Sequence, residues 1–168
     1  MAFKVVITDY EYHDLLIEEE VFSNSPLEIE FVKAQCKTSA EVIEVCRDAD
    51  GIINQYAPIN AEVLSSLENC KVISRYGVGV DTIHLPTAHE KGIIVANVPD
   101  YGIEEVSNHT VALMLAWSRK IVQLNEAVKS GKWDFNIAAP IYRFSNKIFG
   151  VLGFGKIPRR VIEKVSTF

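Results

Sequence analysis

The stretch that decides the fold is Lys71-Val-Ile-Ser-Arg-Tyr-Gly-Val-Gly-Val-Asp81. Its apolar run, residues 72–74, predicts a buried strand, and a glycine-rich loop follows directly. Loops at the carboxyl ends of parallel strands are where α/β proteins bind ligands. Gly77 and Gly79 flank Val78, and this spacing lets backbone N–H groups turn outward to form a small anion-binding concavity. A plain strand-to-turn connection with two permissive glycines would use the same residues, so local chemistry leaves both interpretations open.

Apolar runs and helix patterns alternate on either side of this stretch. Strands are expected at residues 4–8, 27–32, 51–54, 72–74 and 93–96, and helices at 11–22, 38–46 and 60–67. Thr38 and Glu41 form a capping box, and Asn60 is an N-cap residue. Pro86 suits a first helical turn, and Gly92 suits the position after a helix end. The alternation predicts an α/β fold, a doubly wound parallel sheet with flavodoxin-like strand order.

The longest helix is expected over residues 103–128. Apolar residues recur there at positions 103, 106, 113, 117, 121, 124 and 128, close to a 3-4 repeat. A face this wide must be covered on more than one side. A central core helix and a dimerisation arm both satisfy that need, so the pattern leaves both interpretations open.

Residues 147–158 place a glycine loop between a strand, expected at 148–152, and a helix, expected at 159–165. This is the context of the G-x-G-x-x-G dinucleotide fingerprint, in which the helix N-terminus holds the pyrophosphate. Pro158 stands where the third glycine belongs, and it should push Ile157 away from helical angles. The chain also ends before the second strand of the unit and before the acidic residue that binds the ribose.

Three ordered motifs carry a resemblance to a known family: residues 75–81, residues 92–97, and Asp100-Tyr-Gly-Ile-Glu-Glu-Val-Ser-Asn-His-Thr110. They resemble the D-isomer-specific 2-hydroxyacid dehydrogenases, which include D-3-phosphoglycerate dehydrogenase and glyoxylate reductase. The resemblance covers the whole chain, which is about half as long as a usual member. It implies NAD- or NADP-dependent hydride transfer between a nicotinamide and a small 2-keto or 2-hydroxy acid.

The resemblance also implies an organisation into parts. A substrate-binding domain would cover residues 1–100, an interdomain and dimerisation segment 101–146, and the truncated start of a Rossmann NAD-binding domain 147–168. A homodimer would form through residues 103–128. The family's catalytic Arg, Glu and His would lie beyond Phe168, so no catalytic residue is expected here and the chain as it stands should be inactive. A non-catalytic dimerisation or ligand-binding remnant, or an unrelated small α/β binding domain, are the alternatives.

Site residues follow from the same resemblance, position by position. The substrate side would be lined by Asn54, Gln55, Tyr56, Val78 and Gly79. The cofactor side would be lined by Val78, Thr110, Gly153, Gly155, Lys156 and Ile157. Asn108 stands where many relatives have an acid, and the sequence offers no role for it.

Composition excludes several other classes. Charged residues make up 23% of the 168 residues, and the net charge of -5 is spread along the chain, so neither a nucleic-acid footprint nor a basic membrane patch is expected. The longest apolar run, residues 111–117, is too short to span a bilayer. Three cysteines without metal-ligand spacing favour a reduced, cytoplasmic protein with no metal. Asp9 ends a first strand as in phosphoacceptor receiver domains, but the third strand ends in Asn54-Gln55 instead of an acid.

Overall fold

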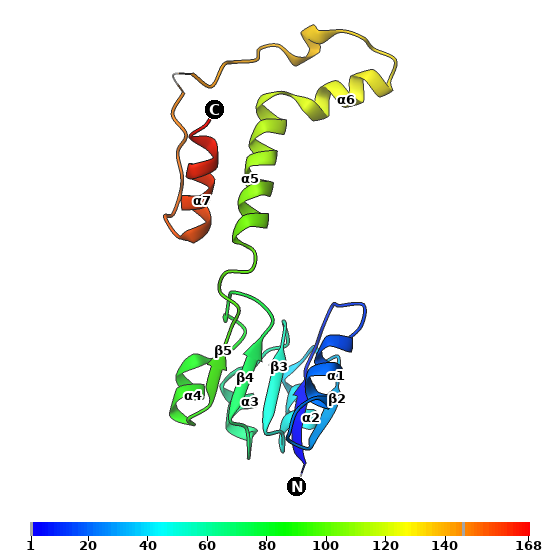
Figure 1. Ribbon diagram of the computed structural model, residues 1–168, viewed down its shortest axis with the longest axis vertical. Coiled ribbons are helices and arrows are strands. Elements are labelled where there is room, and N and C mark those ends of the chain that lie inside the picture. The colour runs from blue at the N-terminus through cyan, green and yellow to red at the C-terminus, as the bar shows by residue number, and fades with distance from the viewer. Residues whose placement is uncertain (1, 146) are drawn as a thin grey trace. The chain divides into compact units, whose positions relative to one another are not determined.

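The computed structural model describes residues 2–145 and 147–168, which form two compact units, Met1–Asp100 and Tyr101–Phe168. The N-terminal unit alternates strands and helices (Figure 1): β1 (Phe3–Ile7), α1 (Leu16–Ser23), β2 (Ile29–Lys33), α2 (Ser39–Cys46), β3 (Gly51–Asn54), α3 (Ala61–Ser66), β4 (Val72–Arg75), α4 (Leu85–Glu90) and β5 (Ile94–Ala96). All pairings are parallel, in the order β2-β1-β3-β4-β5. The predicted doubly wound, flavodoxin-like sheet is confirmed.

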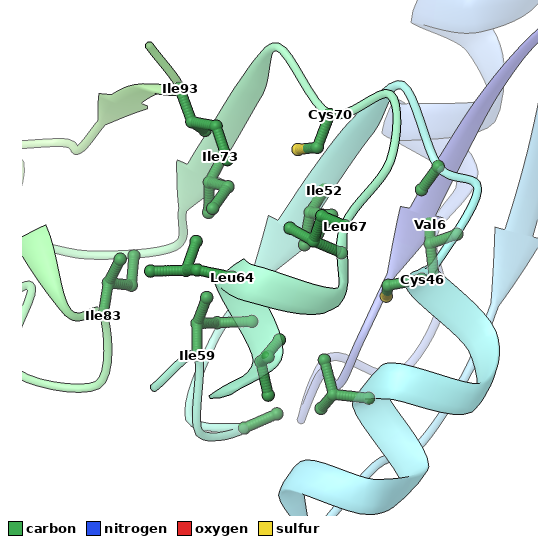
Figure 2. Packing of buried hydrophobic residues seen from close by; sticks show 14 of the residues in the cluster. Val6, Cys46, Ile52, Ile59, Leu64, Leu67, Cys70, Ile73, Ile83 and Ile93 are labelled. Carbon is green, nitrogen blue, oxygen red and sulfur yellow. The ribbon is translucent and has the colours of Figure 1, made fainter. Parts of the chain in front are cut away.

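One face of this sheet carries the hydrophobic core. Val6, Ile52 and Ile73 lie side by side in register and are 0%, 1% and 0% exposed. Residues of α2, α3 and α4, including Cys46 and Leu64, pack on the same cluster (Figure 2). The core therefore fixes the strands whose carboxyl ends carry the candidate site.

The opposite face is covered unevenly. Phe22 of α1 packs against Phe31 of β2, with ring centroids 4.8 Å apart. Farther along the sheet, the paired residues Val72 and Ile94 are 40% and 67% exposed. Parallel sheets normally bury both faces, so the β4–β5 half of this face is an apolar surface that its own unit leaves open.

Local signals behave as the sequence predicts. The capping box of Thr38 and Glu41 is present at α2, and the Asn60 side chain accepts the N–H of Val63 at 3.0 Å to begin α3. Pro86 lies in the first turn of α4, and Gly92 follows that helix with φ 68°. The exception is the first helix, which begins at Leu16 and not at residue 11.

The C-terminal unit contains α5 (Ile103–Ser118), α6 (Ile121–Lys129), the 3-10 turn η1 (Phe135–Ala138) and α7 (Lys156–Val165). The prediction of a single helix over residues 103–128 is wrong, because two helices occupy this range. The chain breaks after Ser118, and Lys120 adopts a left-handed conformation with φ 57°. Its ammonium lies 5.3 Å from the Trp117 ring centroid, a cation–π contact that helps to offset the cost of this conformation.

The strand expected at residues 148–152 is also absent, because the described residues 147–155 form no regular element. Ile148 and Leu152 are fully exposed, and a strand without a neighbour cannot pair its backbone groups. Pro158 lies inside α7, within the first turn, where its missing N–H costs nothing. Ile157 also lies within α7, so the prediction that Pro158 pushes it away from helical angles is wrong. The boundary expected at residue 146 falls on Asn146, which lies outside the described residues.

Candidate functional site

Three loops of the N-terminal unit meet at the carboxyl end of the sheet, because β1, β3 and β4 are adjacent strands. The loops follow Ile7, Asn54 and Arg75. Their side chains and backbone groups form the candidate substrate site.

The two amides predicted on the substrate side already have protein partners. Asn54 is fully buried, its Nδ2 donates to the carbonyl of Ala57 at 2.9 Å, and its Oδ1 accepts the Thr82 hydroxyl at 3.2 Å. Gln55 is 8% exposed, and its Oε1 accepts the N–H of Glu11 at 2.8 Å. A substrate that used either amide would have to displace these partners. Tyr56, next in the chain, is 57% exposed and open to solvent.

The glycine loop presents free backbone donors. The carbonyl oxygens of Gly77 and Val78 are taken by Val98 N–H at 3.0 Å and by Asn97 Nδ2 at 2.7 Å. The N–H groups of Val78 and Gly79 have no acceptor among the described residues. Gly77 has φ 136°, a conformation that side-chain-bearing residues rarely adopt. The loop thus has free N–H groups, which the predicted anion-binding concavity requires.

Arg75 is the residue that sequence reasoning missed. It ends β4 and is half-buried, and its Nε is buried without any hydrogen-bond partner in the described chain. Its guanidinium lies against Gly77, where a side-chain carbon would collide with Nη1, and 5.7 Å from the ring centroid of Tyr56. It joins none of the ion pairs formed by the described residues. An arginine at a strand end, two residues before Gly-x-Gly, was the available signal.

Tyr76 ties the glycine loop to α1. Its hydroxyl donates to Glu18 Oε1 at 2.5 Å, and Tyr12 packs edge-on against its ring at 5.2 Å between centroids. Burial, together with the Glu18 carboxylate, raises the pKa of the Tyr76 hydroxyl well above its ordinary value. The phenol therefore stays protonated at neutral pH and acts as a structural donor.

In the C-terminal unit, the predicted cofactor residues surround the start of α7. Gly153 has φ 92°, and Gly155 is the N-cap residue. The N–H groups of Lys156 and Ile157 have no acceptor among the described residues, so this positive helix end has two free donors. Thr110 lies apart on α5, where its hydroxyl donates back to the carbonyl of Val106 at 2.8 Å.

A polar cluster joins α5 to α7. The Lys164 ammonium donates to Ser107 Oγ and Asn108 Oδ1, both at 2.6 Å, and to Glu104 Oε2 at 2.9 Å. Arg160 pairs with the same Glu104, and these hydrogen bonds lower the pKa of that carboxyl below its usual range. Asn108, to which the sequence assigned no role, is thus an acceptor for Lys164.

The described residues hold no cluster of side chains suited to a metal ion. No helix in the described ranges is long and apolar enough to cross a membrane. Cys36, Cys46 and Cys70 are buried and unpaired. Burial raises the pKa of Cys46 to about 12 and that of Cys70 to about 11, so both thiols are neutral and poorly nucleophilic.

Comparison with known proteins identifies the family to which this chain belongs. Residues 5–167 match the family model described as D-isomer specific 2-hydroxyacid dehydrogenase, catalytic domain. The chain belongs to this family. Its relatives include the D-3-phosphoglycerate dehydrogenase of Methanocaldococcus jannaschii, 36% identical over 98% of this chain and 30% of that protein. The glyoxylate reductase of Thermofilum pendens is 33% identical over 76% of this chain and 39% of its own length.

Solved structures agree on the fold. The D-lactate dehydrogenase of Aquifex aeolicus, complexed with NAD and lactic acid, aligns with a TM-score of 0.81 at 25% identity, over 97% of this chain and 48% of that one. An acyclic imino acid reductase in complex with NADPH and D-Arg gives a TM-score of 0.84 at 21% identity, over 98% and 53%, and supports the fold alone. The chain spans about a third of its curated relatives and about half of these solved structures.

Proposed function

We propose that this chain forms the substrate side of an NAD- or NADP-dependent dehydrogenase that interconverts a small 2-keto acid and its D-2-hydroxy acid. The observation that carries the proposal is the pairing of two free N–H donors, at Val78 and Gly79, with the unpartnered guanidinium of Arg75. A 2-keto acid presents a carboxylate beside a carbonyl oxygen, so it offers acceptors to both. Relatives named for 3-phosphoglycerate, glyoxylate and lactate support this substrate class.

The residues of the chain would bind and orient the acid. The N–H groups of Val78 and Gly79 would receive the carboxylate, because backbone donors in a glycine loop match a planar anion. Arg75 would add a charge-assisted hydrogen bond. Its Nε is buried and has no partner in the described chain, so a rotation of the guanidinium that brings this N–H to a ligand oxygen would satisfy a donor that otherwise stays unpaired. The exposed ring of Tyr56 would cover one side of the acid.

A nicotinamide cofactor, when bound, would donate or accept the hydride at the substrate carbon. The start of α7 fits the pyrophosphate of such a cofactor, because Lys156 and Ile157 offer free N–H groups at a helix N-terminus. Gly153 and Gly155 have no atom within 4 Å of where a side-chain carbon would stand, so the backbone there is open to close approach. Thr110 and Val78 are further proposed contacts on the cofactor side.

We also propose a cytoplasmic homodimer formed through residues 103–128. Within the C-terminal unit, Trp117, Ile121 and Val122 are 72%, 53% and 63% exposed. A hollow of about 820 Å³, lined by Met114, Trp117 and aromatic residues that follow η1, lies beside them. Exposed apolar surface of this kind marks interaction sites. Sedimentation velocity that finds only monomer at 100 µM would reject the dimer.

The test of the substrate proposal is calorimetric titration with glyoxylate. Arg75→Gln removes one charge-assisted hydrogen bond worth about 1.5–3 kcal/mol, so the dissociation constant should rise by roughly 10- to 100-fold. Lys71→Gln is the matched control, since it removes the same charge from the residue just before β4, at the opposite end from Arg75, and should leave the constant unchanged. Equal affinity in the wild-type chain and Arg75→Gln would refute the role of Arg75, and no binding by the wild-type chain would refute the proposal.

A further inference from the structure

A buried carboxylate underlies the candidate substrate site without facing solvent. Asp9 ends β1 and is 8% exposed. Its Oδ1 accepts the Thr8 hydroxyl at 2.8 Å and the N–H of Gln55 at 3.0 Å, and its Oδ2 accepts the N–H of Tyr56 at 2.5 Å. Asp9 forms no ion pair within the described ranges. Its charge is therefore met by hydrogen-bond donors alone, two of which are consecutive backbone groups of the loop after β3.

This carboxylate has a direct effect on which groups a substrate can use. Because Tyr56 gives its N–H to Asp9, that backbone group is withdrawn from the surface while its ring stays exposed. The ring is the one over which the Arg75 guanidinium lies. A change at Asp9 would therefore shift Tyr56 and, with it, the neighbour that holds Arg75 in place.

A second route leads from Asp9 to the glycine loop through Asn54. The Asn54 side-chain Nδ2 donates to Asp9 Oδ1 at 3.3 Å, and the backbone carbonyl oxygen of Asn54 accepts the N–H of Tyr76 at 2.8 Å. The side-chain oxygen of Asn54 accepts the hydroxyl of Thr82 at 3.2 Å. Tyr76 and Thr82 lie on either side of Val78 and Gly79, so the network fixes both ends of the loop that presents the free donors.

We propose that Asp9 is a positioning residue, which holds Tyr56 and the Val78–Gly79 loop in register so that Arg75 and the free N–H groups converge on one anion. This inference rests on the proposed function of the loop as a carboxylate site. Protein donors surround both oxygens of the carboxylate. The binding site would then be the product of a network spanning three strand ends.

The decisive variant is Asp9→Asn, which keeps the size of the side chain. Its one oxygen can still accept from Thr8 and Gln55, but its amide nitrogen then faces the N–H of Tyr56, a donor against a donor. Asp50→Asn is the matched control. Asp50 Oδ2 accepts a single backbone N–H, from Lys4 at 2.8 Å, at the opposite end of the sheet.

The experiment titrates oxamate, an unreactive analogue of a 2-keto acid, into each chain and follows backbone amides by NMR. Asp9→Asn should weaken oxamate binding at least about tenfold, as expected for a lost charge-assisted hydrogen bond. It should also move the ligand-free resonances of Tyr56, Val78 and Gly79, whereas Asp50→Asn should do neither. Wild-type affinity in Asp9→Asn would overturn the inference.

Two further outcomes separate this inference from the proposed function. If the wild-type chain binds no oxamate, the carboxylate-site proposal fails, and the ligand-free shifts at Val78 and Gly79 then decide the positioning role alone. If Asp9→Asn does not fold, hydrogen exchange of the wild-type Tyr56 amide decides it. Strong protection of that amide supports the role, and exchange at the rate of an open loop overturns it.

Discussion

Removing the Asn54 side chain tests whether this buried residue stabilises the fold or is held ready to bind substrate. Asn54→Ala deletes three principal hydrogen bonds, to the Ala57 carbonyl, the Thr8 hydroxyl and the Thr82 hydroxyl, together with the longer contact to Asp9 Oδ1 at 3.3 Å. Each of the three contributes about 1 kcal/mol net to the free energy of unfolding. Ala57 is buried, so its carbonyl oxygen would lose the Asn54 donor at a place that water does not easily reach. The free energy of unfolding should therefore fall by about 3 kcal/mol.

Urea denaturation followed by circular dichroism measures this loss. With a slope of about 1–3 kcal/mol per molar urea, the midpoint should drop by roughly 1–3 M. Asn69→Ala is the control, because Asn69 is exposed and makes one long hydrogen bond of 3.4 Å, and it should cost less than about 0.5 kcal/mol. Asn54→Asp should cost more than Asn54→Ala at neutral pH, since it sets a second carboxylate against Asp9. A loss for Asn54→Ala no larger than that for Asn69→Ala would refute the reasoning.

Three more predictions concern packing, pH and the C-terminal unit. Ile73→Ala should lower the free energy of unfolding, measured by urea denaturation, by about 2–5 kcal/mol. Ile94→Ala, on the open face of the sheet, should lower it by well under half as much. Equal losses would contradict the assignment of the buried and open faces. Burial raises the folded-state pKa of Cys46 to about 12. Above about pH 9 the thiol ionises in the unfolded chain but stays neutral in the folded one. The free energy of unfolding should therefore be unaffected below about pH 9 and should fall as pH rises toward 12, by at most about 1.4 kcal/mol per pH unit. Cys46→Ala should flatten that slope in denaturation measured at pH 8 and pH 11, and an unchanged slope would reject the assignment. Lys164→Met should speed amide hydrogen exchange in α7 while Lys129→Met does not, and unaltered exchange in α7 would show that the cluster at Glu104 does not hold that helix.

Sequence patterns predicted the N-terminal unit well because its signals are local and agree with each other. Thr38, Asn60 and Gly92 act through hydrogen bonds or backbone angles within a few residues. The strands are short, nearly continuous apolar runs, which is the pattern of buried parallel strands. The flavodoxin-like order of the sheet was predicted from the alternation of strands and helices.

The failures arise where neighbours in space decide. Nothing in the sequence near Lys120 resembles a helix breaker, and its left-handed turn is stabilised by a ring one turn away. Residues 148–152 have strand composition but no strand to pair with in the described chain. Asn54 and Gln55 were predicted to line the substrate side. They stand where β3 ends, but only the adjacency of β1 and β3 shows that their amides bond to Thr8 and Glu11.

The most direct test of the central claim is the location of 2-keto acid binding. Glyoxylate titrated into the isotope-labelled chain, with formate as a control for simple anions, should shift the amide resonances of Val78 and Gly79 and the side-chain Nε–H of Arg75, in a saturable manner. The amides of β2, which lies at the far edge of the sheet, should not move. Saturable shifts confined to residues outside the loops after β1, β3 and β4, or no saturable shift anywhere, would contradict the account.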